Sequence, residues 1–356
     1  MIKEFIKKHE RKISAGALLV GFLWDAITLT RIDYFFEVLV LGTHTSLIVL
    51  WILLINFAEG KKLTGWFFGT IRSIAPIFMQ VSFGALFSAL TIFYIKSASL
   101  TATIVFVLIL LGLLIGNEFF RKRYQRFAFQ FSILFIVLTS FFALYLPVLV
   151  GTVGAWVFIL ANVVSAAVIF ILVEFLKFFV PERVNCSRNG LRISIGSISI
   201  ILMLLYFSNI IPPVPLALKE KGIYHDIYRS GDTYVVQKEK ESLLDVVIPG
   251  KTIHYTDGES IVAYSSVFAP TGLETNIAHA WQYWDPENHV WIPQGRISFP
   301  ISGGRDGGFR GYTEKSNLFN GRWRIEVVTK RDQVLGRMEF TLERVDDPVE
   351  QIEERL

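Results

Sequence analysis

Cysteine is almost absent from this chain of 356 residues, in which Cys186 is the only one. The segment from residue 212 onward contains none, so it must hold its fold without disulfide bonds, as a region of roughly 130 residues can do by burying a core. A zinc site would need three or four converging ligands. That segment offers His225, His254, His279 and His289, and none of their spacings matches a local metal motif. We therefore predict no metal and no cofactor.

Motifs of nucleotide binding and nucleophilic catalysis are also missing. No G-x-S-x-G elbow occurs, although serines are plentiful. The glycine run ISGGRDGGFRG, which includes Arg305, lacks the GK[ST] ending of a phosphate-binding loop and does not open a helix. We interpret it as a flexible hairpin loop, with an anion cradle as the alternative. Nothing in the sequence indicates an enzyme.

Long apolar runs, by contrast, are abundant. The chain is 52% hydrophobic with a mean hydropathy of +0.47, too apolar for a soluble globular protein. Residues 1–211 hold 18 Lys+Arg against 9 Asp+Glu, whereas residues 212–356 hold 17 against 22. The basic excess therefore lies in short connections between apolar runs, where a membrane topology signal would place it, and we expect no nucleic-acid partner.

Seven apolar runs are long enough to cross a bilayer as helices. The first follows the basic segment MIKEFIKKHERK, but no small-residue cleavage site comes after it, so we interpret it as an uncleaved helix. The predicted spans are 13–31, 34–57, 72–95, 98–117, 127–147, 152–178 and 193–211.

The connections between these runs predict the orientation. Their Lys+Arg counts are 5, 1, 3, 1, 4, 0 and 4 from the N-terminus, so rich and poor segments alternate. The positive-inside rule places the N-terminus in the cytoplasm and everything after Pro212 outside. We therefore expect a multi-pass protein of a bacterial inner membrane, in contact with the lipid bilayer, with its C-terminal domain in the periplasm.

Ionisable residues lie in the outer half of the first predicted helical hairpin, and charges at membrane depth default to a functional hypothesis. One interpretation is that the arginine and the carboxylates pair and fix the hairpin; the other is a proton, metal or headgroup site. The cluster consists of Asp25, Arg31, Asp33, Glu37 and His44.

Beyond three prolines at 212, 213 and 215, the hydrophobic pattern changes to period two. About eight short antiparallel strands separated by turn sequences predict an all-β sandwich, for which an immunoglobulin-like architecture is one candidate. The predicted organisation is a seven-helix transmembrane domain (1–211), a proline-containing linker (212–222), a periplasmic β-sandwich (223–345) and an acidic tail without ordered structure (346–356).

The stretch NIAHAWQYWDPENHVW, residues 276–291, predicts a hairpin that closes at DPEN. Pairing of Trp284 with His289 and of Trp281 with Ile292 divides its side chains between two faces. His279, Trp281, Tyr283, Val290 and Ile292 form the core face, on which His279 is a hydrogen-bonded core histidine. Trp284, His289 and Trp291 form the other face, and they are the candidate ligand-binding surface unless a loop or the membrane covers them.

The segment from Val262 to Val345 resembles a bacterial domain-of-unknown-function family, number 2914. The resemblance rests on HAW, FRGYTEK and NGRWRIEVVTKRDQVLGRMEF, although the family more often has tryptophan where this chain has Phe309 and Tyr312. It implies a β-rich domain often attached to bacterial membrane segments, and no activity. The matching positions are His279, Trp281, Arg310, Tyr312, Lys315, Trp323 and Arg324.

Arg310 opens a predicted strand and lies within that family-like motif. Stacking of its guanidinium on an aromatic ring is one explanation; binding of an anionic group, such as that of a lipid or a peptidoglycan carboxylate, is the other.

These patterns predict that the β-sandwich binds an envelope ligand, a glycan, a peptidoglycan-type polymer or a protein, while the helices anchor it or respond to it. The first alternative is a transporter or membrane-embedded enzyme whose working groups are Asp25, Glu37 and His44. The second is a scaffold of an envelope complex.

Overall fold

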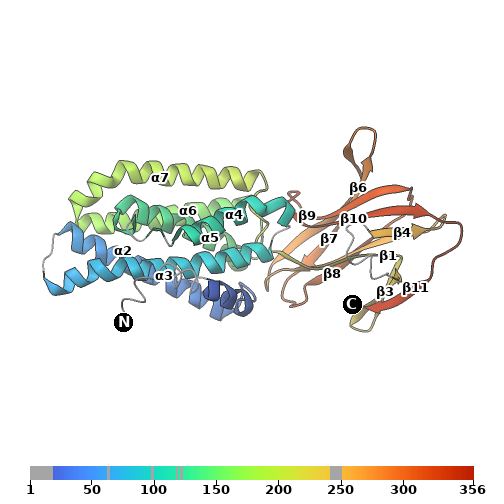
Figure 1. Cartoon of the computed structure of the whole chain (residues 1–356), viewed down its shortest axis with the longest axis horizontal. Coiled ribbons are helices and arrows are strands. Elements are labelled where there is room, and N and C mark those ends of the chain that lie inside the picture. Colours follow the sequence, from blue (N-terminus) through green and yellow to red (C-terminus); the bar gives the residue numbers. More distant parts are fainter. Residues whose placement is uncertain (1–18, 62–64, 98–99, 118, 121–122, 241–250) are drawn as a thin grey trace, which may run out of the picture. The chain divides into compact units, whose positions relative to one another are not determined.

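The structure is a computed structural model that describes residues 19–61, 65–97, 100–117, 119–120, 123–240 and 251–356. The chain divides into two compact units, with the last boundary between Pro215 and Leu216. One unit holds the helices except the first residues of α4 (Leu100–Asn117), which belong to the segment Ser97–Ala102 assigned to the other unit, and that other unit holds the strands. Figure 1 shows the helices and the strands of the two units.

The helical unit contains seven α-helices and one short 3-10 helix among the described residues. The α-helices contain the apolar runs predicted from the sequence. In chain order the helices are a first helix Leu19–Thr28, α2 Phe35–Gly60, α3 Trp66–Lys96, α4 Leu100–Asn117, η1 Arg123–Gln125, α5 Phe127–Val150, α6 Ala155–Phe179 and α7 Pro181–Phe207.

Five of these helices, α2, α3, α5, α6 and α7, are long and apolar enough to cross a membrane. The first helix and α4 are shorter in their described parts, because residues 13–18 and 98–99 of the predicted spans lie outside the described residues. Large apolar side chains cover much of the outer helical surface, where Phe35, Trp66 and Phe178 are each at least 80% exposed. Such a surface suits lipid better than water.

Helix α7 begins at Pro181, twelve residues before the predicted start of the seventh span. Proline at the first helical position and Glu182 in the first turn are typical N-terminal residues of a helix. Arg183, Arg188 and Arg192, which we assigned to a connecting segment, therefore lie on the helix. The hydropathy pattern missed this polar first part of α7 because it detects only the apolar part of a helix.

The β unit contains eleven strands among the described residues, and its all-β class is as predicted. They form three sheets, with the orders β1-β5-β8, β4-β10-β9-β6-β7 and β11-β3-β2. The strands are β1 Ala217–Tyr224, β2 Asp226–Ser230, β3 Thr233–Glu239, β4 Lys251–Tyr255, β5 Ile261–Phe268, β6 Glu274–Asp285, β7 Val290–Ser302, β8 Phe309–Lys315, β9 Gly321–Thr329, β10 Val334–Arg344 and β11 Gln351–Arg355.

Strand β5 is buried along its whole length because its two faces contact different sheets. On one face Val262 and Tyr264 pack with Ile227 of β2 and Val236 of β3. On the other face Ser265 bonds to His279 of β6. The sheet β1-β5-β8 thus lies between the other two.

Three features of the β unit differ from the predictions. Strand β1 begins at Ala217, inside the predicted linker 212–222. Strand β4 was not predicted, and it pairs parallel to β10, so the pairing is not wholly antiparallel. The acidic tail 346–356 is not without structure, since β11 pairs antiparallel with β3 and Lys238 forms a 2.6 Å ion pair with Glu354. The acidic composition suggested disorder, but charged side chains are common on edge strands.

Gly303, directly after β7, lies where no side chain fits. A Cβ on this residue would lie 1.7 Å from the carbonyl oxygen of Pro270, while its N–H donates to the Leu273 oxygen at 2.9 Å. To make room for a side chain, the backbone at Gly303 would have to move away from the Pro270–Leu273 segment, which would break this hydrogen bond. Gly307, four residues further on, has open space around its Cβ position.

We expect Gly303→Ala to lower the free energy of unfolding of the β unit by about 2 kcal/mol or more, as overpacking of a tight site does. Gly307→Ala in the same loop should change it by no more than about 0.5 kcal/mol. Denaturant unfolding of the full-length protein, followed by tryptophan fluorescence, measures both. Equal stability of the two variants would contradict the assigned close approach.

Candidate functional site

The hairpin β6–β7 ends in a turn built around Asp285. Its Oδ1 accepts the backbone N–H of Glu287 at 2.9 Å, and its Oδ2 accepts the side-chain amide of Asn288 at 2.7 Å. His289 has a φ of 53° and therefore belongs to the turn, so Asp285 pairs with Val290.

This turn moves the strand register two residues from the predicted one. Trp284 pairs with Trp291, not with His289, and Tyr283 pairs with Ile292. The prediction failed because it placed His289 in the strand. A shift of two keeps each side chain on its own face, so Trp284 and Trp291 share a face as expected.

The two tryptophans form the centre of a surface at the hairpin tip. Their ring centroids are 5.3 Å apart in a T-shaped arrangement, the geometry that aromatic quadrupoles favour. The His289 ring lies 6.2 Å from Trp284. Both indoles are half-buried and His289 is exposed.

Two arginines of β9 lie over these rings. The Arg322 guanidinium is 5.5 Å from the Trp291 centroid and 6.0 Å from that of Trp284, and Arg324 is 4.2 Å from Trp291. These distances are within the range of cation–π interactions, which stabilise indole rings that are only half-buried. We call Trp284, His289, Trp291, Arg322 and Arg324 the tryptophan–arginine surface.

Polar neighbours hold the arginines in place. Arg322 forms a 2.6 Å ion pair with Glu339 of β10, and Arg324 Nε donates to Gln282 Oε1 of β6 at 2.7 Å. The alternation of apolar and charged residues indicates that Arg322, Arg324 and Glu339 lie on the charged faces of their strands. It does not indicate that β9 lies beside β6.

The core face predicted for this hairpin is correct only in part. Trp281 is fully buried, whereas Val290 and Ile292 are 48% and 38% exposed. Strand β9 pairs with β6 only as far as Tyr283, so the hairpin tip extends beyond its neighbour and nothing covers these two side chains in the described structure. They leave apolar area exposed on the face of the hairpin tip opposite to the tryptophan–arginine surface.

His279 is a core histidine, as predicted. Its Nε2 lies 2.7 Å from Ser265 Oγ and its Nδ1 2.8 Å from Thr313 Oγ1, so it joins β6 to β5 and β8 across the core. Burial lowers its pKa to about 4, and the ring is neutral at physiological pH. Its hydrogen bonds are satisfied inside the protein, which is a structural role.

The other family-like positions divide between core and surface. Trp323 is fully buried, and the Lys315 ammonium lies 5.8 Å from its ring while donating to the Gln294 oxygen at 3.0 Å. Tyr312 is 46% exposed and packs edge-on against Tyr234 of β3. These contacts give the aromatic and cationic residues of the motif structural roles in this chain.

The resemblance seen in the sequence is confirmed by a family model. Residues 274–342 match the family described as protein of unknown function, DUF2914. The match runs from the start of β6 to Leu342 of β10, and it therefore includes every residue of the tryptophan–arginine surface. No curated protein matches the chain.

Among solved structures the similarities are distant. A β-glucosidase from Listeria innocua in complex with gluconolactone is 12% identical, with a TM-score of 0.20, over 34% of this chain and 17% of that one. A β-glucosidase from Kluyveromyces marxianus is 9% identical, with a TM-score of 0.17, over 38% and 15%. A DNA-bound alkylpurine DNA glycosylase from Pseudomonas fluorescens is 10% identical, with a TM-score of 0.20, over 88% and 99%. The chain thus spans less than a fifth of the two glucosidases, and none of the three scores indicates a shared fold.

Outside the DUF2914 region, a partly buried cluster of two histidines and two glutamates connects β3 and β4 with the segment before β2 and the segment before β5. His225 Nδ1 lies 2.8 Å from Glu259 and its Nε2 lies 3.1 Å from Glu239. His254 Nδ1 lies 2.9 Å from the second oxygen of Glu239. The sequence did not indicate this cluster because its members come from four separate segments.

These contacts shift the protonation of the cluster. Burial lowers the pKa of His225, but its hydrogen bonds with Glu239 and Glu259 outweigh burial, so the pKa is raised overall. Burial raises the pKa of Glu239, but hydrogen bonds from His225 and His254 lower it to about 2. The folded protein therefore favours a charged histidine between two carboxylates.

The predicted intramembrane cluster separates into parts. Arg31 pairs with Asp33 at 2.5 Å and lies over the Tyr34 ring, which fixes the turn between the first helix and α2. Glu37 is buried and accepts a hydrogen bond from Thr30 at 3.1 Å. These contacts support the interpretation that ion pairing fixes the hairpin.

Asp25 and His44 behave differently. Asp25 accepts a 2.5 Å hydrogen bond from Ser88 of α3 and lies close enough to His44 for an electrostatic interaction. His44 Nδ1 is buried and has no hydrogen-bond partner in the described structure. A buried polar atom without a partner is unusual and marks this pair as a second candidate site.

A satisfied polar network lies elsewhere in the helical unit, and the sequence analysis missed it. Asn56 of α2 donates to Gln130 of α5 at 2.5 Å and accepts from Arg183 of α7 at 2.7 Å. Arg183 also donates to the Gln125 oxygen at 2.9 Å. The network joins three helices and assigns Arg183 a structural role.

No group of three or more histidine, cysteine, aspartate or glutamate side chains that could hold a metal ion occurs in the part of the chain that the structure describes.

The cluster around His225 predicts a pH-dependent stability. Because its pKa is raised on folding, His225 contributes stability that is fully present below 6.5 and is lost as the pH rises through the raised value. Because the Glu239 pKa is lowered, its contribution is present above 4.5 and is lost as the pH falls towards 2. We therefore expect the cluster to stabilise the β unit most between these two values.

At pH 5.5, His225→Asn should cost about 2 kcal/mol, the size of hydrogen bonds to charged groups, and the cost should shrink at pH 9. Unfolding of the full-length protein at both pH values measures this difference. His289→Asn, an exposed histidine of the same unit, is the control. A cost of His225→Asn that is the same at both pH values would exclude the ionic role.

Proposed function

We propose that the protein is a multi-pass protein of a bacterial inner membrane that binds an envelope ligand through the tryptophan–arginine surface of a periplasmic β-sandwich, immunoglobulin-like in architecture. The N-terminus is cytoplasmic in this proposal. The five long apolar helices, the exposed apolar residues of the helical unit and the alternation of basic connections support it.

One observation carries the binding role: two tryptophans and two arginines meet on the outer face of the five-stranded sheet without completing a core. The core of the β unit is formed by other side chains, among them Trp281 and Trp323. Because the tryptophan–arginine surface is partly open, its aromatic area is left for a partner.

Of the three ligand classes expected, a protein partner fits the geometry best. Tryptophan and arginine are the residues most enriched in binding hot spots, and here a charged rim formed by Arg322 and Glu339 borders the aromatic centre. Guanidinium groups already lie over the indole rings, which leaves less free ring face for a sugar to stack on.

Site-specific photocrosslinking in native membranes tests this proposal. A photoreactive residue at His289, an exposed member of the surface, should give one discrete adduct that is sensitive to protease. Trp284→Ala combined with Trp291→Ala should reduce its yield about ten-fold or more, as the loss of hot-spot residues does. Tyr312→Ala, an exposed aromatic elsewhere in the unit, should leave the yield unchanged.

An adduct that survives protease and is removed by glycan-cleaving enzymes would make the ligand a glycan instead. No adduct from His289, or the same adducts from His289 and from the exposed Ile352 of β11, would contradict binding at this surface. Several stable partners crosslinked from many surface positions would favour the scaffold alternative.

A second function is favoured by the Asp25–His44 pair, a transport or proton-transfer site within the helices. The observation that supports it is the buried Nδ1 of His44 next to Asp25. Glu37 is not part of this second proposal, because its carboxylate is bonded to Thr30.

If the pair transfers protons, liposomes containing the purified protein should conduct protons under an imposed pH gradient. Asp25→Asn should reduce this flux about ten-fold or more, as the loss of a proton-transfer group does. Glu37→Gln is the matched control and should not change it. Absence of flux in the wild-type protein, with the fold intact, would remove this second candidate.

A further inference from the structure

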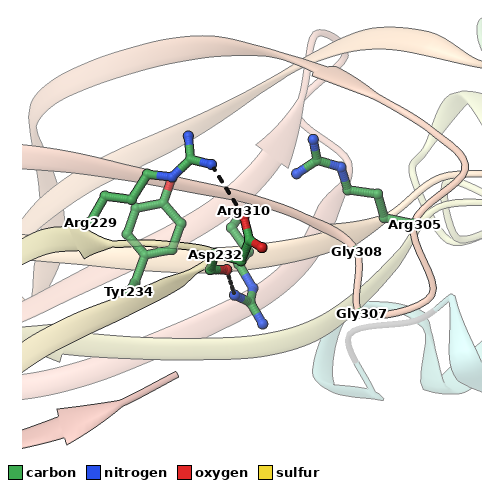
Figure 2. Close-up of a pocket in the computed structure, with 7 residues that line it drawn as sticks. All are labelled: Arg229, Asp232, Tyr234, Arg305, Gly307, Gly308 and Arg310. Carbon is green, nitrogen blue, oxygen red and sulfur yellow. Dashed lines mark hydrogen bonds and ion pairs between the residues drawn. The ribbon is translucent and has the colours of Figure 1, made fainter.

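Two turns of the β unit border an open cavity of about 300 Å³ that shares no residue with the tryptophan–arginine surface. One is the turn between β2 and β3; the other is the glycine loop before β8, which we had interpreted as a flexible hairpin loop. Figure 2 shows the seven residues that line the cavity, which are Arg229, Asp232, Tyr234, Arg305, Gly307, Gly308 and Arg310.

The lining carries a surplus of positive charge. Three guanidinium groups face one carboxylate, that of Asp232, whose side chain is fully exposed and lies 3.9 Å from Arg229. At such exposure an ion pair neutralises little. No carboxylate of the described residues lies within ion-pair distance of Arg305 or Arg310. The cavity is therefore cationic.

The arginines are held by contacts that orient them and leave their charge in place. Arg229 Nε donates to the Gly231 oxygen at 3.0 Å, and Arg310 Nη1 approaches the Asp232 carbonyl oxygen at 3.4 Å. Arg305 lies 5.7 Å from the Phe309 ring. In Figure 2 dashed lines join Arg229 and Arg310 to Asp232, while Arg305 approaches from the glycine loop.

The glycine loop that forms the opposite wall is fixed by close packing. Gly308 has a φ of +86°, and a Cβ on it would lie 2.6 Å from Ser266 Oγ and 2.9 Å from the Val267 carbonyl carbon. The buried Ser266 hydroxyl donates to the Gly307 oxygen, which joins the loop to the central strand β5. The glycines thus let the loop lie against β5 and hold Arg305 opposite Arg229.

We propose that this arginine cavity binds a phosphate group. Guanidinium forks match the oxygens of phosphate and carboxylate, and arginine is the side chain that binds them in bidentate fashion. The surplus of two positive charges in the lining favours a group that carries close to two negative charges, as a phosphate monoester does at neutral pH. A single carboxylate would leave one guanidinium uncompensated.

Calorimetric titration of inorganic phosphate into the full-length protein in a non-ionic detergent tests the site. We expect saturable binding of one phosphate per chain. Arg305→Gln combined with Arg310→Gln should weaken it about ten-fold or more, since each guanidinium contributes a charged hydrogen bond. Arg296→Gln, an exposed arginine that pairs with Asp332 away from the cavity, removes charge elsewhere and should leave the affinity within about two-fold.

Because the double variant could be misfolded, its thermal unfolding is measured in parallel, and Arg229→Gln alone is titrated as an independent variant at the other turn. No saturable binding by the wild-type protein, or equal affinity of wild type and folded variants, would overturn the proposal. Tighter binding of a monocarboxylate such as acetate than of phosphate would overturn it as well.

Titration with glycerol 3-phosphate distinguishes the source of the phosphate. Binding of both compounds indicates a phosphate carried on a lipid headgroup or polymer, and binding of inorganic phosphate alone indicates the free ion. This test is independent of the crosslinking test, because no residue of the cavity belongs to the tryptophan–arginine surface.

Discussion

Every backbone N–H and carbonyl removed from water needs a hydrogen-bond partner, and the two units of this chain meet that requirement in different ways. In the helical unit each segment satisfies its own backbone, so its outer surface can be apolar. In the β unit the partners come from neighbouring strands, and a strand such as β5 can be buried on both faces because other sheets cover it. In the β unit, the proposed binding sites lie at a hairpin tip and at turns, where the strands have no further neighbours.

Buried polar side chains follow the same rule. His279 is bonded on both ring nitrogens, His225 lies between two carboxylates, and Asn56 bonds to two other helices. Each of these groups joins elements that are distant in sequence. Among the described residues, Thr139 Oγ1, Asn162 Nδ2 and His44 Nδ1 are buried without a hydrogen-bond partner. Of these three, only His44 is ionisable and lies near a carboxylate, that of Asp25, which supports the second candidate function.

Periodicity predicted the elements well, because the apolar runs and the alternation at Trp323, Ile325 and Val327 are local properties of the sequence. It also placed Trp284 and Trp291 on one face, since the face depends only on whether the spacing is even or odd. The exact pairing was wrong because it depended on the backbone of one turn residue, His289, whose positive φ the sequence does not reveal. Strand β11 was missed because its pairing with β3 is a long-range contact.

The two proposed binding sites show the same limit. Arg310 was a candidate from its own motif, but its neighbours Arg229 and Arg305 reach it from turns that are 76 residues apart in the chain. Arg322 likewise meets Trp284 only because β9 lies beside β6. Residue type and alternation indicated candidate residues, and the order of strands in the sheets decided which of them meet.

The central claim is that the tryptophan–arginine surface lies on the opposite side of the membrane from the start of α7. The native Cys186, exposed on α7, makes a direct measurement possible. In cells with a permeabilised outer membrane, a thiol reagent that does not cross the inner membrane should leave Cys186 unlabelled. In a Cys186→Ser background, a cysteine introduced at the exposed Asp347 of the β unit should be labelled. Labelling of Cys186, or protection of position 347 until the inner membrane is broken, would contradict the account.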